Sequence, residues 1–485
     1  MGTDNLKDSA ISSLFWKLFE RGGNAVVQMV VQVVMARLLA PEQFGMLAIM
    51  LVFVNLGSVI VQSGLNTALI QAPDATEDDC STVFWFSLAV SLALYAAVFL
   101  SAPGIAAFYA MPGLVWPLRA LALLLVVNAY NAIQIAVITR DLELRKVFNA
   151  TVVSSLASAA IGIGCALAGA GVWALVFQQL SYQAVNCLVH AAQISWRPRA
   201  VFDVARARAL LSFGWKLLAS GLLDQGYQSL SDLLIGRVFS PGQLGLVSQG
   251  KKYPAAIGSM LDGAIQPVML SAVSRVQDDV PRVRSLVRRG LKTSTFLLVP
   301  SMALFAVAAP SLVPALLGPQ WSECVPFMQV YCLVYALLPI HTTNLQALNG
   351  MGRSDLFLRL ELVKKAIGVA WILIAAFVVG DVYILVLGYL ATGVFSTFIN
   401  ALPNRRVIGY PYGDQLRDIA PAVLLTAAAS AVAALAVPAT GLAGLPLVLA
   451  QAAAFALVYL ALAAAFRVEA LMYLVGTVRG FISSR

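Results

Sequence analysis

The chain has 485 residues, of which 60% are hydrophobic and only 11% are charged, and its formal net charge is +9. A soluble globular domain carries about 25% charged residues, so this composition excludes an ordinary soluble protein. The net positive charge does not indicate a nucleic-acid partner, because basic loops are the usual orienting signal of a membrane protein.

Apolar runs of about 20 residues, the length that spans a bilayer as a helix, recur along the whole chain. Lipid offers the backbone no hydrogen-bond partners, and these runs are too long and too uniform for barrel strands. The sequence therefore predicts an all-α integral membrane protein with about fourteen transmembrane helices. The predicted spans are 12–36, 45–64, 83–102, 114–138, 148–168, 172–193, 210–236, 243–270, 293–312, 326–349, 363–380, 382–402, 419–437 and 446–466.

Basic residues are distributed unequally between the two sets of loops. One set and its flanks hold 20 lysines and arginines, in the segments 140–146, 197–208, 275–292, 353–365 and 405–417. The opposite set holds only Arg37, Arg119 and Arg237. The positive-inside rule places the basic set, and with it both termini, in the cytoplasm. The inner loop 66–82 is an exception, because it carries Asp and Glu and no basic residue.

A short sequence pattern occurs twice at a constant offset. Residues 36–45 align with residues 236–245 at an offset of 200, sharing Arg, Pro, Gln and Gly. Upstream, Trp16-Lys17-Leu18 matches Trp215-Lys216-Leu217 at an offset of 199, a slippage of one residue. The copies begin six helices apart, which predicts a parallel repeat about an axis along the membrane normal. We expect two pseudo-symmetric six-helix lobes at 1–193 and 210–402, joined by a cytoplasmic linker at 194–209. Residues 403–485 hold helices 13 and 14 and a cytoplasmic tail.

Polar residues follow one face of several predicted spans. In the first span, Glu20, Gln28 and Gln32 recur at multiples of four residues, with Arg21 beside them. The seventh and eighth spans carry a further set, which consists of Asp224, Asp232, Lys251, Lys252, Ser259, Asp262 and Gln266. Such side chains are costly in lipid and usually face a cavity or another helix, so a shared central cavity explains the set best. The alternative is that the amides join helices to one another.

The charged members of this set allow two interpretations each. Asp224 lies near the middle of its span, where a lone ionised carboxylate is prohibitive, so it binds a proton or cation or belongs to an ion pair. Lys251 and Lys252 either pair with Asp232 or bind a phosphate. Asp232, Glu20 and Asp262 are candidates for coupling or gating, whereas Glu20 and Arg21 could also snorkel to the interface.

Sequence signatures of catalysis and of cofactor binding are absent. The two histidines, His190 and His341, fall on different spans, and no Walker or Rossmann pattern occurs. The five cysteines lack metal-ligand spacing. We therefore expect a transporter without a cofactor or metal rather than an enzyme, and transport coupled to an ion gradient or to the substrate's own gradient.

The N-terminal pattern resembles that of a known exporter family. Trp16-Lys17, Gly22-Gly23, Gln28 and the segment 36–45 are similar to the opening of Wzx-type polysaccharide exporters. The segments 62–71 and 348–353 are similar too, and the resemblance covers about residues 10–410. Within the multidrug, oligosaccharidyl-lipid and polysaccharide exporter superfamily, the colanic-acid-exporter type is the most similar.

This resemblance implies a flippase of the bacterial inner membrane that acts in exopolysaccharide, capsule or lipopolysaccharide O-antigen synthesis. The substrate would be an undecaprenyl-pyrophosphate-linked oligosaccharide repeat unit, which crosses from the cytoplasmic to the periplasmic leaflet by alternating access. A polysaccharide polymerase and a chain-length regulator are possible partners, and a proton or sodium ion is a possible coupling ion. From depth and charge, Arg21, Lys251 and Lys252 are expected to bind the pyrophosphate, with Gln28, Gln32, Ser259 and Gln266 around it.

Two other functions remain open at this stage. A cation-coupled multidrug extruder of the same superfamily is the main alternative, although such proteins usually have twelve helices and a more acidic cavity. A membrane glycosyl- or acyltransferase would need an intramembrane histidine or a carboxylate cluster near an interfacial loop. His190 stands alone in its span, and the acidic segment 66–82 has no recognisable partner residues in the sequence.

Overall fold

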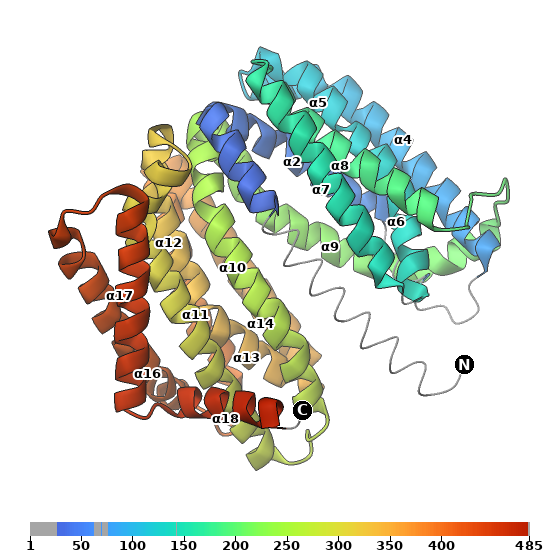
Figure 1. Ribbon diagram of the computed structural model, residues 1–485. Helices are drawn as coiled ribbons and strands as arrows, with labels where there is room; N and C mark the ends of the chain where they lie inside the picture. Colours follow the sequence, from blue (N-terminus) through green and yellow to red (C-terminus); the bar gives the residue numbers. More distant parts are fainter. Residues whose placement is uncertain (1–26, 63–68, 70–75, 142, 484–485) are drawn as a thin grey trace. The chain divides into compact units, whose positions relative to one another are not determined.

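The computed structural model describes the whole chain except residues 1–26, 63–68, 70–75, 142 and 484–485 (Figure 1). The described residues form helices joined by turns and contain no β-strand. They divide into two compact units, Met1–Gly245 and Leu246–Arg485, which are described separately below. The predicted all-α class is therefore confirmed.

The first unit consists of helices that begin and end close to the predicted spans. Its elements are Val27–Leu38, α2 (Pro41–Gln62), α4 (Glu77–Phe108), η1 (Pro112–Leu114), α5 (Val115–Leu121), α6 (Leu123–Arg140), α7 (Leu144–Leu167), α8 (Val172–Gln193), α9 (Val204–Val238) and the first turn of α10 (Pro241–Ser274).

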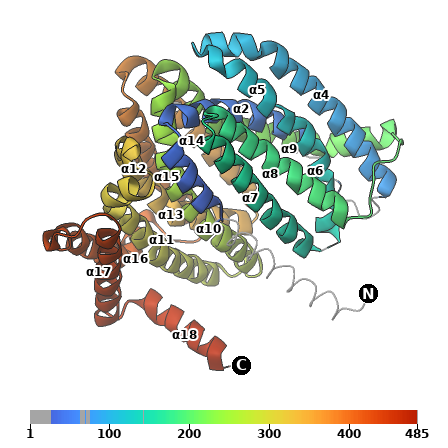
Figure 2. The same ribbon diagram turned by 45° about the horizontal axis from the view of Figure 1, so that its top comes forward.

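Within this unit, α7 and α8 form a tight antiparallel hairpin that runs side by side in both Figure 1 and Figure 2. The turn between them uses Gly169 and Gly171, whose positive φ angles of 77° and 58° are unfavourable for other residues. Helix α2 packs against α4, α6, α8 and α9, so it lies at the centre of the unit.

The first turns of α2 and α10 meet through two glycines, both within the first unit. A Cβ atom on Gly45 would lie 1.7 Å from the carbonyl oxygen of Pro241, and one on Gly245 would lie 2.0 Å from that of Pro41. The contact is therefore reciprocal between the two copies of the repeated pattern. Only glycine permits so close an approach of the two backbones.

The second unit continues α10 and holds the remaining helices. They are α11 (Val280–Leu316), η2 (Pro319–Cys324), α12 (Val325–Ala336), α13 (Leu338–Gly350), α14 (Ser354–Ile374), η3 (Ala375–Val379), α15 (Val382–Val407), α16 (Tyr412–Ala431), η4 (Val432–Ala436), η5 (Pro438–Thr440), α17 (Gly444–Ala465) and α18 (Glu469–Ser483).

Helix α11 organises this unit, because α12, α13, α16, α17 and α18 all pack against it. Buried Phe296 of α11 lies in one cluster with Leu425 of α16 and Tyr459 of α17. The Tyr459 hydroxyl donates a hydrogen bond to the Phe296 carbonyl at 2.9 Å. Apolar packing and a hydrogen bond from a side chain of α17 to the backbone of α11 thus hold the two helices together.

Eleven helices in the described part of the chain are long and apolar enough to cross a membrane, so the protein is a multi-pass membrane protein. The helix Val27–Leu38 is apolar but short. Helices α8 and α9 have 22 and 35 residues but are more polar and are not among the eleven. These are the predicted spans 1, 6 and 7, so the predicted number of fourteen is not confirmed.

The acidic segment 66–82 was interpreted from the sequence as a loop without partner residues, but its last residues form the start of α4 and contact basic side chains. Thr76 and Asp79 form a reciprocal N-terminal cap, and the Arg206 guanidinium contacts the Asp79 carboxylate at 2.9 Å and 3.3 Å. Arg199 lies 2.5 Å from Glu77. Carboxylates at a helix N-terminus are favoured by the helix dipole, and the basic segment that follows α8 neutralises them.

Two other basic or polar segments are helical where the sequence predicts loop or tail. Residues 280–292 form the first turns of α11, and residues after Glu469 form α18. The predicted lobe boundaries at 1–193, 194–209 and 210–402 concern the repeat and stay a prediction. Residues 194–203, inside the predicted linker, form no regular secondary structure before α9 begins.

Candidate functional site

Helix α10 carries the polar face that the sequence predicts. It continues through Pro254 and Pro267 without a break, and Lys252, Ser259 and Gln266 recur along it at seven-residue intervals. All three side chains are exposed, whereas Lys251 is only partly exposed. The Ser259 hydroxyl donates to the Ala256 carbonyl at 3.1 Å and can still accept a hydrogen bond.

Neither lysine of this face pairs with a carboxylate of its own unit, as far as the described residues extend. An unpaired ammonium group is costly in a hydrocarbon environment and is stabilised only by water or by an anion. The α10 face thus offers positive charge, hydroxyl and amide groups along about 14 residues of one helix.

Asp262 of the same helix already has a partner. The Thr342 hydroxyl of α13 donates a short hydrogen bond to its carboxylate. Both residues belong to the second unit, so the bond joins α10 to α13 there. A gating role for Asp262 would therefore work by forming or breaking this bond.

The predicted residues of the first span are only partly described. Gln28 donates a hydrogen bond of 3.5 Å to the Ser155 hydroxyl of α7, which favours the alternative that this amide joins helices. Gln32 is 9% exposed, and its Oε1 atom has no hydrogen-bond partner among the described residues. Glu20 and Arg21 lie outside the described residues.

The two acidic residues of α9 lie in the first unit. Asp224 is exposed and accepts a hydrogen bond of 2.8 Å from the Gln228 amide one turn later. Asp232 is half-buried. The Asp224 carboxylate is thus exposed and accepts a hydrogen bond from an amide of its own helix.

The structure thus brings Lys252, Ser259 and Gln266 onto one exposed helix face, and it gives Asp262 and Gln28 structural partners. Lys251, Lys252, Ser259, Asp262 and Gln266 belong to the second unit, and Gln28, Gln32, Asp224 and Asp232 belong to the first. The described residues include no group of three or more His, Cys, Asp or Glu side chains that could hold a metal ion.

Two histidine–asparagine pairs, one buried and one partly buried, were not predicted. In the first unit His190 Nδ1 lies 2.9 Å from the Asn131 oxygen, and in the second His341 Nδ1 lies 2.9 Å from the Asn400 amide. Both pairs are 59 residues apart in the sequence. A single shift of 210 residues maps 131 onto 341 and 190 onto 400, with the two residue types exchanged. This equal spacing is the signal that could have identified them.

Comparison with known proteins identifies relatives for most of the chain. The family described as polysaccharide biosynthesis protein matches residues 34–326. The succinoglycan biosynthesis transport protein ExoT of Rhizobium meliloti is 25% identical over 339 residues, which are 70% of this chain and 68% of ExoT. The lipopolysaccharide biosynthesis protein WzxC of Escherichia coli is 23% identical over 405 residues, 82% of this chain and 81% of WzxC.

A solved structure shares the fold at much lower identity. The lipid II flippase MurJ in its inward closed conformation has a TM-score of 0.74 and 11% identity, over 94% of this chain and 98% of MurJ. This similarity shows a common fold. The resemblance to Wzx-type exporters seen in the sequence is confirmed, and the chain belongs to the polysaccharide biosynthesis protein family.

Proposed function

We propose that this protein is a flippase of the bacterial inner membrane. It moves an undecaprenyl-pyrophosphate-linked oligosaccharide from the cytoplasmic to the periplasmic leaflet for the synthesis of a surface polysaccharide. ExoT is named as a transport protein of succinoglycan biosynthesis and WzxC as a protein of lipopolysaccharide biosynthesis, and both support this proposal. Both termini lie in the cytoplasm, and a polymerase and a chain-length regulator act on the delivered substrate.

The exposed polar face of α10 is the observation that carries the proposal. Lys252, Ser259 and Gln266 stand in a helix long and apolar enough to cross a membrane, where such groups need a polar partner. A pyrophosphate provides the anion for Lys251 and Lys252, and sugar hydroxyls match Ser259 and Gln266. Arg21, Gln28 and Gln32 complete the proposed binding set.

Alternating access follows from the proposed repeat. Lobes at 1–193 and 210–402 rock about the substrate, while the lipid tail stays in the bilayer. Asp224 binds a proton or sodium ion that couples this motion, and Asp232, Glu20 and Asp262 act in coupling or gating. Asp262 contributes through its hydrogen bond to Thr342.

The lysines provide the decisive test. In a strain that lacks the chromosomal gene, Lys251→Ala with Lys252→Ala should reduce polysaccharide export at least tenfold, because the pyrophosphate loses its counter-charges. Lys251→Arg with Lys252→Arg keeps the charges and should retain export. Membrane levels of the variants, measured by immunoblot, control for folding. Normal export by the double alanine variant would contradict the assignment and make Arg21 the next residue to test.

Asp224 is tested in the same assay at several pH values and sodium concentrations. Asp224→Asn removes the negative charge, and the oxygen of the new side chain can still accept the hydrogen bond from Gln228. Export should therefore fall and lose its dependence on pH or sodium. An unchanged dependence would remove Asp224 from the coupling mechanism.

The main alternative, a cation-coupled multidrug extruder, predicts a different phenotype. Deletion of the gene would then lower resistance to cationic drugs and leave polysaccharide export intact. A membrane glycosyl- or acyltransferase predicts that the lipid-linked oligosaccharide is incomplete in the deletion strain. A flippase predicts instead that the complete lipid-linked unit accumulates on the cytoplasmic side.

A further inference from the structure

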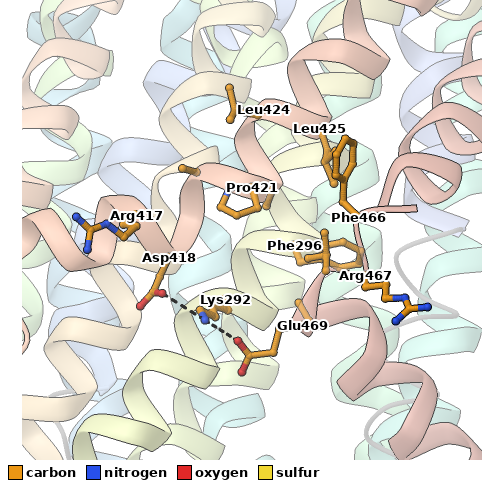
Figure 3. A pocket seen from close by; sticks show the side chains of 14 residues that line it. Lys292, Phe296, Arg417, Asp418, Pro421, Leu424, Leu425, Phe466, Arg467 and Glu469 are labelled. Atoms are coloured by element: carbon orange, nitrogen blue, oxygen red, sulfur yellow. Dashed lines mark hydrogen bonds and ion pairs between the residues drawn. The ribbon is translucent and has the colours of Figure 1, made fainter. Parts of the chain in front are cut away.

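A pocket of about 580 Å³ opens in the second unit, away from the α10 face (Figure 3). It lies between α11, α16 and the turn that joins α17 to α18. One part of its lining is apolar and the other is charged, and none of its residues belongs to the proposed substrate site.

The apolar part of the pocket has a closed floor and an open side. Phe296, Ala422 and Leu425 are buried and form the floor. Leu424 and Phe466 are 68% and 71% exposed on the open side. In a multi-pass membrane protein, exposed apolar side chains of this size face lipid, so the pocket is accessible to an acyl chain.

The centre of the charged part is already neutralised. Lys292 lies 2.6 Å from Glu469 and 3.3 Å from Asp418. Arg288 holds Asp418 through two hydrogen bonds of 2.6 Å and 2.8 Å, and the Tyr410 hydroxyl donates a third at 2.7 Å. Two cations and two carboxylates therefore balance one another here.

Two arginines remain at the mouth of the pocket. Arg417 and Arg467 are exposed and have no ion-pair partner within the described residues. Figure 3 shows them on opposite sides of the Lys292–Asp418–Glu469 centre. The pocket lining thus includes two arginines without an ion-pair partner among the described residues, next to an apolar side that faces lipid.

The backbone of Arg467 is strained. Its φ angle is +48°, in the left-handed region that usually holds glycine at the end of a helix. The N–H groups of Arg467 and Val468 bond to the carbonyls of Ala464 and Ala463, which locks this turn. An arginine costs about 1 kcal/mol here relative to glycine. Glycine would be more stable at position 467, but the arginine present there contributes a guanidinium to the pocket.

Helix α18 fixes the level of the pocket relative to the membrane surface. It packs against α11, where its residues Glu469 and Tyr473 contact Lys292 and Arg289. Met472 and Tyr473 are 58% and 45% exposed. A short helix with apolar residues that lies across transmembrane helices has the geometry of an interfacial helix.

We propose that this pocket binds an anionic phospholipid of the surrounding membrane. Arg417 and Arg467 supply the positive charge that attracts the phosphodiester, and one acyl chain lies along Leu424 and Phe466. Arginine suits this role because its guanidinium bonds phosphate oxygens in pairs. The two positive charges match one or two phosphodiesters, and the apolar side excludes a soluble phosphate as the preferred ligand. The proposal does not depend on the exported substrate.

The test uses the purified, delipidated full-length protein in a neutral detergent. Dioleoylphosphatidylglycerol should raise the thermal unfolding temperature, and the zwitterionic dioleoylphosphatidylcholine should not. Arg417→Gln with Arg467→Gly should increase the half-saturating phosphatidylglycerol concentration about tenfold or more. Glycine relieves the strain at position 467, so the lipid-free variant should be at least as stable as the wild type near that turn. A loss of lipid response therefore does not reflect a failure to fold.

Arg359→Gln with Arg405→Gln is the matched control, because it removes two exposed charges of the same unit outside the pocket. This variant should respond to phosphatidylglycerol like the wild type. Equal responses of the pocket variant and the wild type would overturn the proposal, as would equal stabilisation by phosphatidylcholine. Stabilisation by undecaprenyl phosphate but not by phosphatidylglycerol would show a substrate site and would also overturn it.

Discussion

In the described part of each unit a histidine forms a hydrogen bond with an asparagine, and the two pairs use the residues in opposite order. In the first unit the asparagine is on α6 and the histidine on α8, and in the second the histidine is on α13 and the asparagine on α15. His190, Asn131 and Asn400 are all below 5% exposed. The feature common to both units is therefore a hydrogen bond between two helices and not a fixed order of the residues.

This interpretation predicts that the pair in the first unit can be exchanged. His190→Ala should lower the free energy of unfolding by about 1 kcal/mol, because Asn131 loses its partner in a buried position. The exchanged variant, Asn131→His with His190→Asn, should recover most of the loss, since the second unit already uses that order. The measurement is thermal unfolding of the purified protein. The idea fails if the exchanged variant is less stable than either single variant.

The sequence was sufficient to predict the polar face of α10, because residues seven positions apart are two turns apart and lie on the same side of a helix. It was not sufficient to predict the partner of Asp262, which comes from Thr342 on a helix far along the chain. The Asn131–His190 contact could not be predicted for the same reason, since its residues lie on different helices. Contacts between distant helices depend on packing, and a single sequence reports on that packing only through repeats.

At the scale of elements, the reciprocal contact between the first turns of α2 and α10 sets the strictest local constraint. Four backbone groups meet there without side chains between them, at Pro41, Gly45, Pro241 and Gly245. Prolines suit the first turn of a helix, because their missing N–H would have no partner there. The repeated sequence pattern thus allows the first turns of two helices to cross in close contact.

Gly45→Ala and Gly245→Ala should each be severely destabilising. The added Cβ would overlap a proline carbonyl oxygen, and real Cβ atoms do not approach other atoms so closely. A loss of about 3 kcal/mol is expected, since a backbone atom cannot move aside as a side chain can. Yield of monodisperse protein and unfolding temperature are the measurements. Gly104→Ala is the control, because nothing lies within 4 Å of its added Cβ. Similar behaviour of all three variants would contradict the crossing.

The C-terminal tail illustrates what sequence analysis of elements missed. Residues after Glu469 form α18, although they are too few to span a membrane, so a search for apolar runs of membrane-spanning length does not identify them. In the same way, α11 begins at Val280, about three turns before its apolar run. Hydropathy identifies only the part of a helix that lies in lipid. The helices extend beyond that part, and ion pairs such as Arg284–Asp414 join their polar ends.

For the whole molecule, the distribution of basic residues predicts the orientation in the membrane. The described helices include eleven that can span it, and three further segments decide the total: the short helix Val27–Leu38 and the more polar helices α8 and α9. An even total keeps both termini on the same side. The predicted cytoplasmic set contains Arg284, Arg288 and Lys292, which in the structure lie in the first turns of α11.

Cysteine labelling tests this orientation. Ser240→Cys and Thr440→Cys should react with a membrane-impermeant maleimide added to intact spheroplasts. Arg284→Cys should react only after the membrane is opened. The parent protein controls for the native cysteines, of which Cys80, Cys187, Cys324 and Cys332 are buried and Cys165 is partly exposed. Labelling of Arg284→Cys in intact spheroplasts would reverse the orientation.

The contact of Gly45 with Pro241 and of Gly245 with Pro41 also bears on how the chain arose. A contact in which residue i meets residue j and j meets i is the mark of an isologous interface between two identical subunits. Fusion of two such subunits into one gene would leave the contact inside a single chain. The two glycines would then descend from one ancestral position that faced its own copy. Neither could be replaced alone without collision, so both copies would keep their glycine while the surrounding helices diverged.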